Sequence, residues 1–438
     1  MLKVRYFFRL IGAFISRFKG IILLSAFLGS AGFFLIRALG PNLLGASTVR
    51  IGITGRFTPD SLPNNILEMV GDGLTQTDNA GDVTPNLSSS WESSEDGKTW
   101  TFHLKEASWQ DGKRVTSQSI VYQFSDLTID RPEANTLVFK LKTPYAPFPS
   151  VVSKPTFRKG LLGTGDWKVS KIILAAGNVQ ELDLKGKKGE RTIYKFYPTE
   201  KQTKIAFKLG QVDKIEDIFS TSEFENWKTT KIEKEVDQTR YVVIFFNTQD
   251  NLLNGKNFRQ ALDYAINKDN FDGPRALGPI SPDSWAYNPQ VKPYSYDPTR
   301  AKELLSDLPK EMKANLTLKL STTPVLLKDA EKIAKDWEEI GVKTTIQVVS
   351  GIPTDYQAFL AIFDTPKDPD QYAIWHSTQT STNISHYQSP RIDKLLEDGR
   401  VELNQENRKK IYWDFQRFLV EDCPAVFIYH PTTYTMAR

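Results

Sequence analysis

The chain has very little of what disulfide-stapled folds and metal centres require. Its 438 residues contain one cysteine, Cys423, and four histidines. A single cysteine excludes an internal disulfide and any cysteine-based zinc site. Because Cys423 stands before Pro424 in an apolar segment, we interpret it as a small buried hydrophobic residue. The sequence also has no internal repeat, and no low-complexity segment apart from an apolar stretch near its start.

The signatures of common catalytic sites are missing as well. HExxH and G-x-S-x-G do not occur, and the turn at Gly163 and Gly165 is not followed by the GKS/T of a phosphate-binding loop. One cluster could pass for an active site, made of Asp364, Asp368, Asp370, His376 and His386. Nine residues separate its two histidines, which matches no standard zinc spacing. We therefore predict a protein without metal, cofactor or catalytic residues, and not an enzyme.

The formal net charge of +4 is unevenly distributed. Residues 1–46 carry six basic side chains and no acidic one, so the remainder has a net charge of 4 − 6 = −2. A mildly acidic body has no general attraction for phosphate backbones, which argues against nucleic acid as a partner. The length allows two or three domains with sizeable cores.

The amino-terminal segment predicts attachment to a membrane. Residues 20–36 are uncharged and mostly apolar, which is just long enough to span a bilayer. The basic residues before them orient the start of the chain toward the cytoplasm and the body outward. We predict a basic stub and a transmembrane signal anchor within residues 1–46. A cleaved signal peptide is the alternative, and it is less favoured because Leu44 stands where a small residue is preferred.

The strongest local pattern lies in the middle of the chain. The apolar run 241–246 predicts a buried strand, and residues 258–266 show the i, i+3, i+4 spacing of a helix with one buried face. Asp297 and Pro298 predict the start of another helix, as N-cap and first residue. In the first half, Thr116 is predicted to cap a short helix that reaches residue 124.

A strand–helix–strand unit fixes the fold class. Residues 316–320 alternate as a strand, residues 324–340 have helical spacing and end at Gly341, and residues 344–349 alternate again. Short links between these elements predict a βαβ unit with two parallel strands. The sequence therefore predicts an α/β protein.

Several blocks together resemble the extracellular solute-binding proteins of the oligopeptide, dipeptide and nickel type, the family 5 substrate-binding proteins of ABC transporters. The blocks include FFNTQDNLLNGKNFRQALDYAINKDNF and LSSSWESSEDGKTWTFHLKEASWQDGKRVTSQSIVYQF, in collinear order within residues 50–438. The resemblance implies a two-lobed periplasmic-binding-protein-like (type II) α/β fold with mixed sheets. Lobe I would be residues 47–240 and lobe II residues 241–438, with a hinge crossover near 241–248.

The resemblance also implies a function. Such a protein would be an extracytoplasmic receptor that binds a small ligand between its lobes and delivers it to ABC permease subunits in the membrane. A short peptide is the expected ligand. Relatives on this scaffold also bind chelated nickel, haem or oligosaccharides, and fold analogy does not choose among them.

The resemblance places the ligand in the cleft beside two polar loops. The predicted ligand-binding residues are Asp364, Asp368, Asp370, Tyr372, Trp375, His376, Trp285 and Tyr287. Peptide-binding relatives pair an aspartate just before an Asp-Pro turn with the amino terminus of the peptide. Asp364 is the nearest match, but its distance from Asp368 differs from the spacing in relatives, so all three aspartates stay candidates. The plainer alternative is a turn-rich loop without a ligand role.

One departure from the family pattern leaves other functions open. The chain ends at Arg438, whereas relatives continue back into the first lobe, so we expect the return segment to be missing. A sensory or interaction module that kept the fold but lost transport is therefore the main alternative. A hydrolase is a weaker alternative, because no catalytic geometry is apparent.

Overall fold

The computed structural model describes residues 17–21, 25, 29–30, 48–313 and 316–438. The predicted anchor lies mostly outside these residues. Among the residues that are described, no helix has both the length and the apolar character needed to cross a bilayer.

Lobe I is built on two larger sheets and a two-stranded sheet formed by β2 and β3. Its seven-stranded sheet has the order β12-β18-β11-β1-β10-β9-β8, and a four-stranded sheet has the order β4-β5-β7-β6. The strands of the large sheet are β1 (Thr48–Thr54), β8 (Trp167–Ala175), β9 (Asn178–Gly186), β10 (Arg191–Tyr197), β11 (Lys214–Ile218), β12 (Lys231–Val236) and β18 (Thr432–Ala437). The remaining strands are β2 (Thr75–Thr77), β3 (Val83–Pro85), β4 (Ser88–Ser93), β5 (Thr99–Leu104), β6 (Leu127–Glu133) and β7 (Thr136–Leu141). The helices are a short 3-10 turn at Pro59–Ser61, α2 (Asn64–Val70), α3 (Phe148–Val151) and α4 (Glu200–Lys208).

Lobe II is a five-stranded mixed sheet with helices on both faces. The order is β15-β14-β16-β13-β17, in which β14 runs parallel to β15 and β16, and β13 runs antiparallel to β16 and β17. The strands are β13 (Arg240–Phe246), β14 (Thr317–Thr322), β15 (Lys343–Val348), β16 (Ala358–Asp364) and β17 (Ala425–Tyr429). The helices are α5 (Lys256–Ala265), α6 (Pro298–Ser306), α7 (Lys310–Lys313), α8 (Leu327–Glu339), α9 (Tyr372–Trp375), α10 (Pro390–Val401) and α11 (Gln405–Asp422), with 3-10 turns at Lys268–Asn270 and Pro324–Leu326.

Strand β13 is buried on both faces because helices cover both sides of its sheet. Val242, Ile244 and Phe246 face a core that includes α5, α6 and α8. Tyr241, Val243 and Phe245 face a second core with α9, α10 and α11. A strand buried on both faces reads as a continuous apolar run. The predictions of this strand, of helix α5, of the helix that Asp297 caps and of the parallel βαβ unit are confirmed.

The predicted helix at residues 116–124 is wrong. Residues 117–119 form a turn and residues 120–124 have no regular structure, although the apolar residue Ile120 is fully buried. Ser119 Oγ accepts a hydrogen bond from the Thr116 backbone N–H, and Ser117 Oγ donates to the carbonyl of Glu133. Side chains that bond the backbone locally offer an alternative to helical hydrogen bonds, which the spacing of apolar residues does not reveal.

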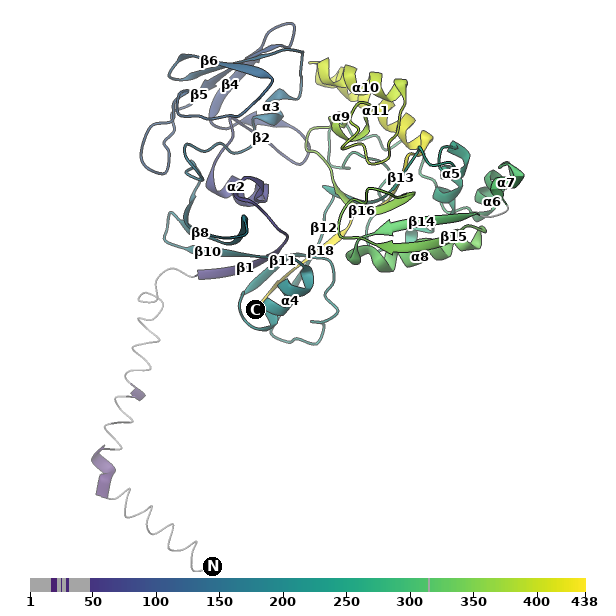
Figure 1. Ribbon diagram of the computed structural model, residues 1–438. Coiled ribbons are helices and arrows are strands. Elements are labelled where there is room, and N and C mark those ends of the chain that lie inside the picture. The colour runs from purple at the N-terminus through teal and green to yellow at the C-terminus, as the bar shows by residue number, and fades with distance from the viewer. Residues whose placement is uncertain (1–16, 22–24, 26–28, 31–47, 314–315) are drawn as a thin grey trace, which may run out of the picture.

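The expectation of a missing return segment is also wrong. Strand β18 leaves lobe II and pairs antiparallel with β12 and β11 in the large sheet of lobe I. The chain thus crosses between the lobes at residues 237–239 and again at residues 430–431. The two crossings run side by side, because β12 pairs with β18 on the lobe I side of them and β13 pairs with β17 on the lobe II side. Figure 1 shows the lobes side by side, with β12 and β18 at the lower junction.

Candidate ligand-binding site

Asp364 ends strand β16 at the point where the sheet of lobe II approaches the crossings. Its partner in the antiparallel register is Arg240, the first residue of β13. Arg240 Nε lies 3.8 Å from Asp364 Oδ1, and the Asp364 side chain is 88% exposed. The aspartate is therefore fixed by the sheet at its backbone while its carboxylate stays open to solvent.

Two other carboxylates already occupy the guanidinium of Arg240. Asp217 of β11 accepts hydrogen bonds from Nη1 at 3.0 Å and Nη2 at 2.7 Å, and Asp237 accepts from Nε at 2.5 Å. Burial acts to lower the pKa of Arg240, but these two carboxylates outweigh burial and raise it. Three carboxylates thus surround one guanidinium, which leaves the charge of Asp364 largely uncompensated.

The pKa of Asp364 reflects these surroundings. Although the side chain is 88% exposed, nearby protein atoms displace part of the water around the carboxyl group, and this partial desolvation raises its pKa first. The charge of Arg240 opposes the rise, and the charges of Asp237 and Asp217 add to it. A carboxylate that protein surrounds, that has no close partner of its own and that solvent still reaches is suited to pair with a cationic group.

Asp368 has a partner within its own lobe. Arg408 of α11 donates to both of its carboxylate oxygens, at 2.9 and 2.6 Å, and the two side chains are only 7% and 12% exposed. Arg408 Nε also donates to the carbonyl of Gly399 in α10, at 2.7 Å. Burial acts to lower the pKa of Arg408, but the charges and hydrogen bonds of Asp368 and Tyr412 together outweigh burial and raise it. The pair fastens the loop after β16 to helices α10 and α11.

Asp370 is held in the same way by Arg400 of α10. Arg400 Nε lies 2.9 Å from Asp370 Oδ2, and the hydroxyl of Tyr145 from lobe I donates to the same oxygen at 3.1 Å. The Arg400 guanidinium lies 3.8 Å from the ring centroid of Tyr372, and that ring stacks on His376 at 3.9 Å. Asp370, Tyr372 and His376 are thus brought together around one arginine.

The other predicted aromatic residues have different surroundings. Trp375 is fully buried in the lobe II core, with its ring 5.8 Å from that of Phe245. Trp285 is half-buried beside Arg408, and its backbone N–H donates to the carbonyl of Ala80 in lobe I at 2.9 Å. Tyr287 is also half-buried, and burial raises the pKa of its hydroxyl.

The sequence analysis did not identify the three arginines that give these aspartates different surroundings. Arg240, Arg400 and Arg408 lie outside the polar loop and come from a strand and two helices. Nothing in their local sequence distinguishes them from surface arginines. The pairing of β13 with β16 places residues 240 and 364 opposite each other, and this pairing is seen only in the folded chain.

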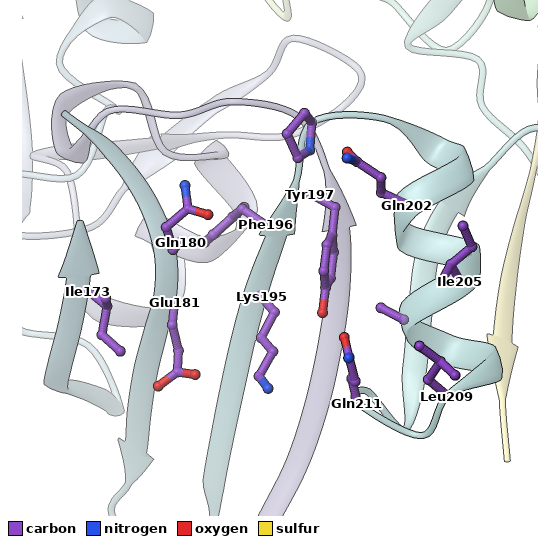
Figure 2. A pocket seen from close by; sticks show the side chains of 12 residues that line it. Ile173, Gln180, Glu181, Lys195, Phe196, Tyr197, Gln202, Ile205, Leu209 and Gln211 are labelled. Carbon is purple, nitrogen blue, oxygen red and sulfur yellow. The ribbon is translucent and has the colours of Figure 1, made fainter. Parts of the chain in front are cut away.

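A separate pocket of about 420 Å³ lies on lobe I, away from the predicted residues. Figure 2 shows it on the face of the large sheet, between the strands that carry Ile173 and Glu181 and the helix that carries Ile205 and Leu209. No predicted ligand-binding residue lines it. Among the described residues, no group of His, Cys, Asp and Glu side chains is arranged to hold a metal ion.

The chain is similar to proteins of known fold. The chain is 23% identical over 461 residues to the dipeptide-binding protein of Escherichia coli K12, covering 82% of each chain. The solved structure of oligopeptide-binding AppA from Bacillus subtilis with a nonapeptide superposes with a TM-score of 0.72 at 21% identity, covering 90% of this chain and 94% of that one. NikZ from Campylobacter jejuni with Ni(L-His) gives a TM-score of 0.73 at 22% identity, covering 89% and 94%.

These likenesses establish the two-lobed periplasmic-binding-protein-like fold. The family itself is shown by a sequence profile, that of the middle part of the bacterial extracellular solute-binding proteins, family 5, which matches residues 82–384. Members of that family are solute-binding proteins and not enzymes. The chain belongs to family 5 of the bacterial extracellular solute-binding proteins.

Proposed function

We propose that this chain is an extracytoplasmic receptor that binds a short peptide between its lobes and delivers it to the permease subunits of an ABC importer. Its family supports the receptor function, and the dipeptide- and oligopeptide-binding relatives support a peptide as the ligand. The observation that carries the proposal is the exposed carboxylate of Asp364 at the interlobe junction, whose neighbour Arg240 is shared with Asp217 and Asp237.

Asp364 would anchor the ammonium group at the amino terminus of the peptide. Asp368 and Asp370 are less suited to this role, because Arg408 and Arg400 already neutralise them. Trp285, Tyr287 and Tyr372 keep part of their surface exposed and would contact the peptide beyond its first residue. Trp375 and His376 are buried and would shape the site from behind.

Binding would couple to closure of the lobes about the two crossings at residues 237–239 and 430–431, the first of which lies just before the hinge predicted near residues 241–248. A ligand favours the closed form only through contacts that the open form lacks. An extended peptide can pair its backbone with strand edges while pockets accept varied side chains. A single ion pair with Asp364 would then set the register of the peptide.

The proposal includes the domain division and the location. Residues 1–46 would be a cytoplasmic stub and membrane anchor, residues 47–240 lobe I and residues 241–438 lobe II, with the strand at 432–437 returning to the sheet of lobe I. The body would lie on the extracytoplasmic side, tethered near the permease. Detection of the full-length chain in the membrane fraction after a carbonate wash would support the anchor, and release of a shortened chain would contradict it.

Calorimetric titration of the detergent-solubilised chain with trialanine tests the anchor role of Asp364. We expect Asp364→Asn to weaken binding by about 2–5 kcal/mol, roughly 30-fold or more, because the ammonium group loses its charged partner inside the site. Acetylated trialanine, which lacks the ammonium charge, should bind the unaltered protein as weakly as trialanine binds the Asp364→Asn variant.

Asp355→Asn is the matched control, since Asp355 is an almost fully exposed aspartate of the same lobe. Its affinity for trialanine should equal that of the unaltered protein. Equal affinities of the Asp364→Asn and Asp355→Asn variants would exclude Asp364 as the anchor.

A further inference from the structure

We propose that the loop of residues 365–371 is a latch that holds the two lobes together before any ligand arrives. The effect of the latch on ligand affinity rests on the proposed receptor function. The basis of the proposal is a set of direct contacts that Lys367 and Asp370 of this loop, with neighbouring residues of lobe II, make with lobe I, and these contacts involve neither crossing nor Asp364.

Lys367 makes the first set of contacts. Its Nζ donates to the carbonyl of Thr77 in β2 at 3.0 Å and lies 3.6 Å from the carboxylate of Glu68 in α2. Its own carbonyl faces Gly81, where the Cβ of any other residue would come within 2.6 Å of that oxygen. Gly81 also has a positive φ of 85°, which suits glycine. The lobe I turn at Gly81 therefore packs directly against the backbone of Lys367, with no room for a side chain at position 81.

Asp370 and its partner Arg400 make the second set of contacts with lobe I. The hydroxyl of Tyr145 donates to Asp370 Oδ2, and the backbone N–H of Ala146 donates to the carbonyl of Arg400 at 2.6 Å. The Arg400 guanidinium lies between two aromatic rings, 5.3 Å from the centroid of Tyr145 and 3.8 Å from that of Tyr372. One ring belongs to lobe I and the other to lobe II, so the arginine contacts both lobes.

Two neighbouring contacts extend the junction. Trp285 donates its backbone N–H to Ala80, and Gln405 Nε2 donates to Asp82 Oδ1 at 3.1 Å. The turn between β2 and β3 therefore contacts three segments of lobe II: the latch loop, the loop that carries Trp285 and the start of α11. Figure 1 shows β2 and α3 of lobe I beside α9 and α10 of lobe II, far from the junction at β12 and β18.

The latch changes how ligand affinity is set. If only the closed form binds tightly, the apparent affinity is the intrinsic affinity multiplied by the closed fraction. Protein–protein contacts that close the lobes in advance keep that fraction near one. A variant that lowers the closed fraction to about one in ten should bind peptide about tenfold more weakly, although no ligand contact is altered.

Distances between labels on the two lobes test the latch. Cys423 is fully buried, so cysteines introduced at the exposed positions Glu92 in lobe I and Glu406 in lobe II can be labelled selectively for energy transfer. We expect the ligand-free protein to give the same short distance as the peptide-bound protein. Tyr145→Phe combined with Lys367→Met should lengthen the ligand-free distance, lower the affinity for trialanine about tenfold and recover the short distance when peptide saturates it.

Tyr296→Phe combined with Lys394→Met is the matched control, because both side chains make exposed contacts within lobe II. It should keep the short distance and the full affinity. A ligand-free protein that is already open, or a latch variant that stays closed, would overturn the proposal. Asp364→Asn separates the two proposals, since it should lose peptide affinity while its ligand-free distance stays short.

Discussion

Asp364 and Asp368 are four residues apart and each lies beside an arginine, yet they differ in exposure and in whether that arginine is shared with other carboxylates. Asp364 is 88% exposed and lies beside an arginine that other carboxylates already occupy. Asp368 is nearly buried and receives two hydrogen bonds from an arginine that serves it alone among the described carboxylates. The same residue type thus holds the scaffold together at one position and keeps a charge available at the other.

The comparison explains why a polar loop can be both rigid and receptive. The ion pairs of Asp368 and Asp370 fix the loop to helices α10 and α11, so the open carboxylate at its beginning has a defined position. Preorganised charge binds a ligand more strongly than mobile charge, because less ordering is needed on binding.

Removing the buried charge at position 368 should have the largest effect. Asp368→Asn leaves Arg408 buried without its carboxylate, and breaking one partner of a buried pair costs about 3–5 kcal/mol of unfolding free energy. Urea unfolding followed by tryptophan fluorescence measures this loss. Asp368→Leu combined with Arg408→Met should recover much of it, since neither charge is then stranded. If Asp368→Asn unfolds like the unaltered protein, the pair does not stabilise the loop.

Acidification should act on Asp364 next. Its pKa is raised by partial desolvation from neighbouring protein atoms and by the charges of Asp237 and Asp217, so the carboxylate gains its proton at a higher pH than an ordinary aspartate. A protonated Asp364 cannot pair with an ammonium group. Affinity for trialanine should therefore be greatest above that pKa and fall by about tenfold per pH unit below it. Calorimetry between pH 4 and 7 measures the fall, and Asp364→Asn should remove it. An unchanged profile in that variant would assign the titration to another group.

The fold was predictable wherever the signal was local. The apolar run of β13, the helical spacing of α5 and the Gly341 stop after α8 each follow from neighbouring residues, and family resemblance supplied the two lobes. The return of β18 was not predictable in this way, because its partners lie about 200 residues earlier in the chain. Serine and threonine hydrogen bonds likewise removed the helix expected at 116–124.

The candidate site was predictable only in outline. Sequence located the loop with its three aspartates but could not rank them, because ranking depends on arginines 30 to 40 positions away for Asp370 and Asp368 and 124 positions away for Asp364. An ion pair between distant segments leaves no periodicity in either segment. The separation of structural from available carboxylates therefore follows from the folded chain alone.

The contrast between satisfied and unsatisfied polar groups extends to two buried tyrosines, where the expected effects are smallest. Tyr412 is fully buried, and its hydroxyl accepts a hydrogen bond from Arg408 at 3.3 Å. Tyr241 is equally buried, but within the described part of the chain its hydroxyl has no hydrogen-bond partner. Losing a hydroxyl that makes a bond costs about 1 kcal/mol, whereas losing an unpaired buried one is neutral or stabilising.

Tyr241→Phe should therefore leave the unfolding free energy unchanged or raise it by up to about 1 kcal/mol, and Tyr412→Phe should lower it by about 1 kcal/mol. The two substitutions remove the same atom from equally buried rings of lobe II, so the difference between them isolates the hydrogen bond. Parallel urea titrations measure that difference. Equal losses in both variants would mean that the Tyr241 hydroxyl has a polar partner of its own, since burial of the ring cannot distinguish the two positions.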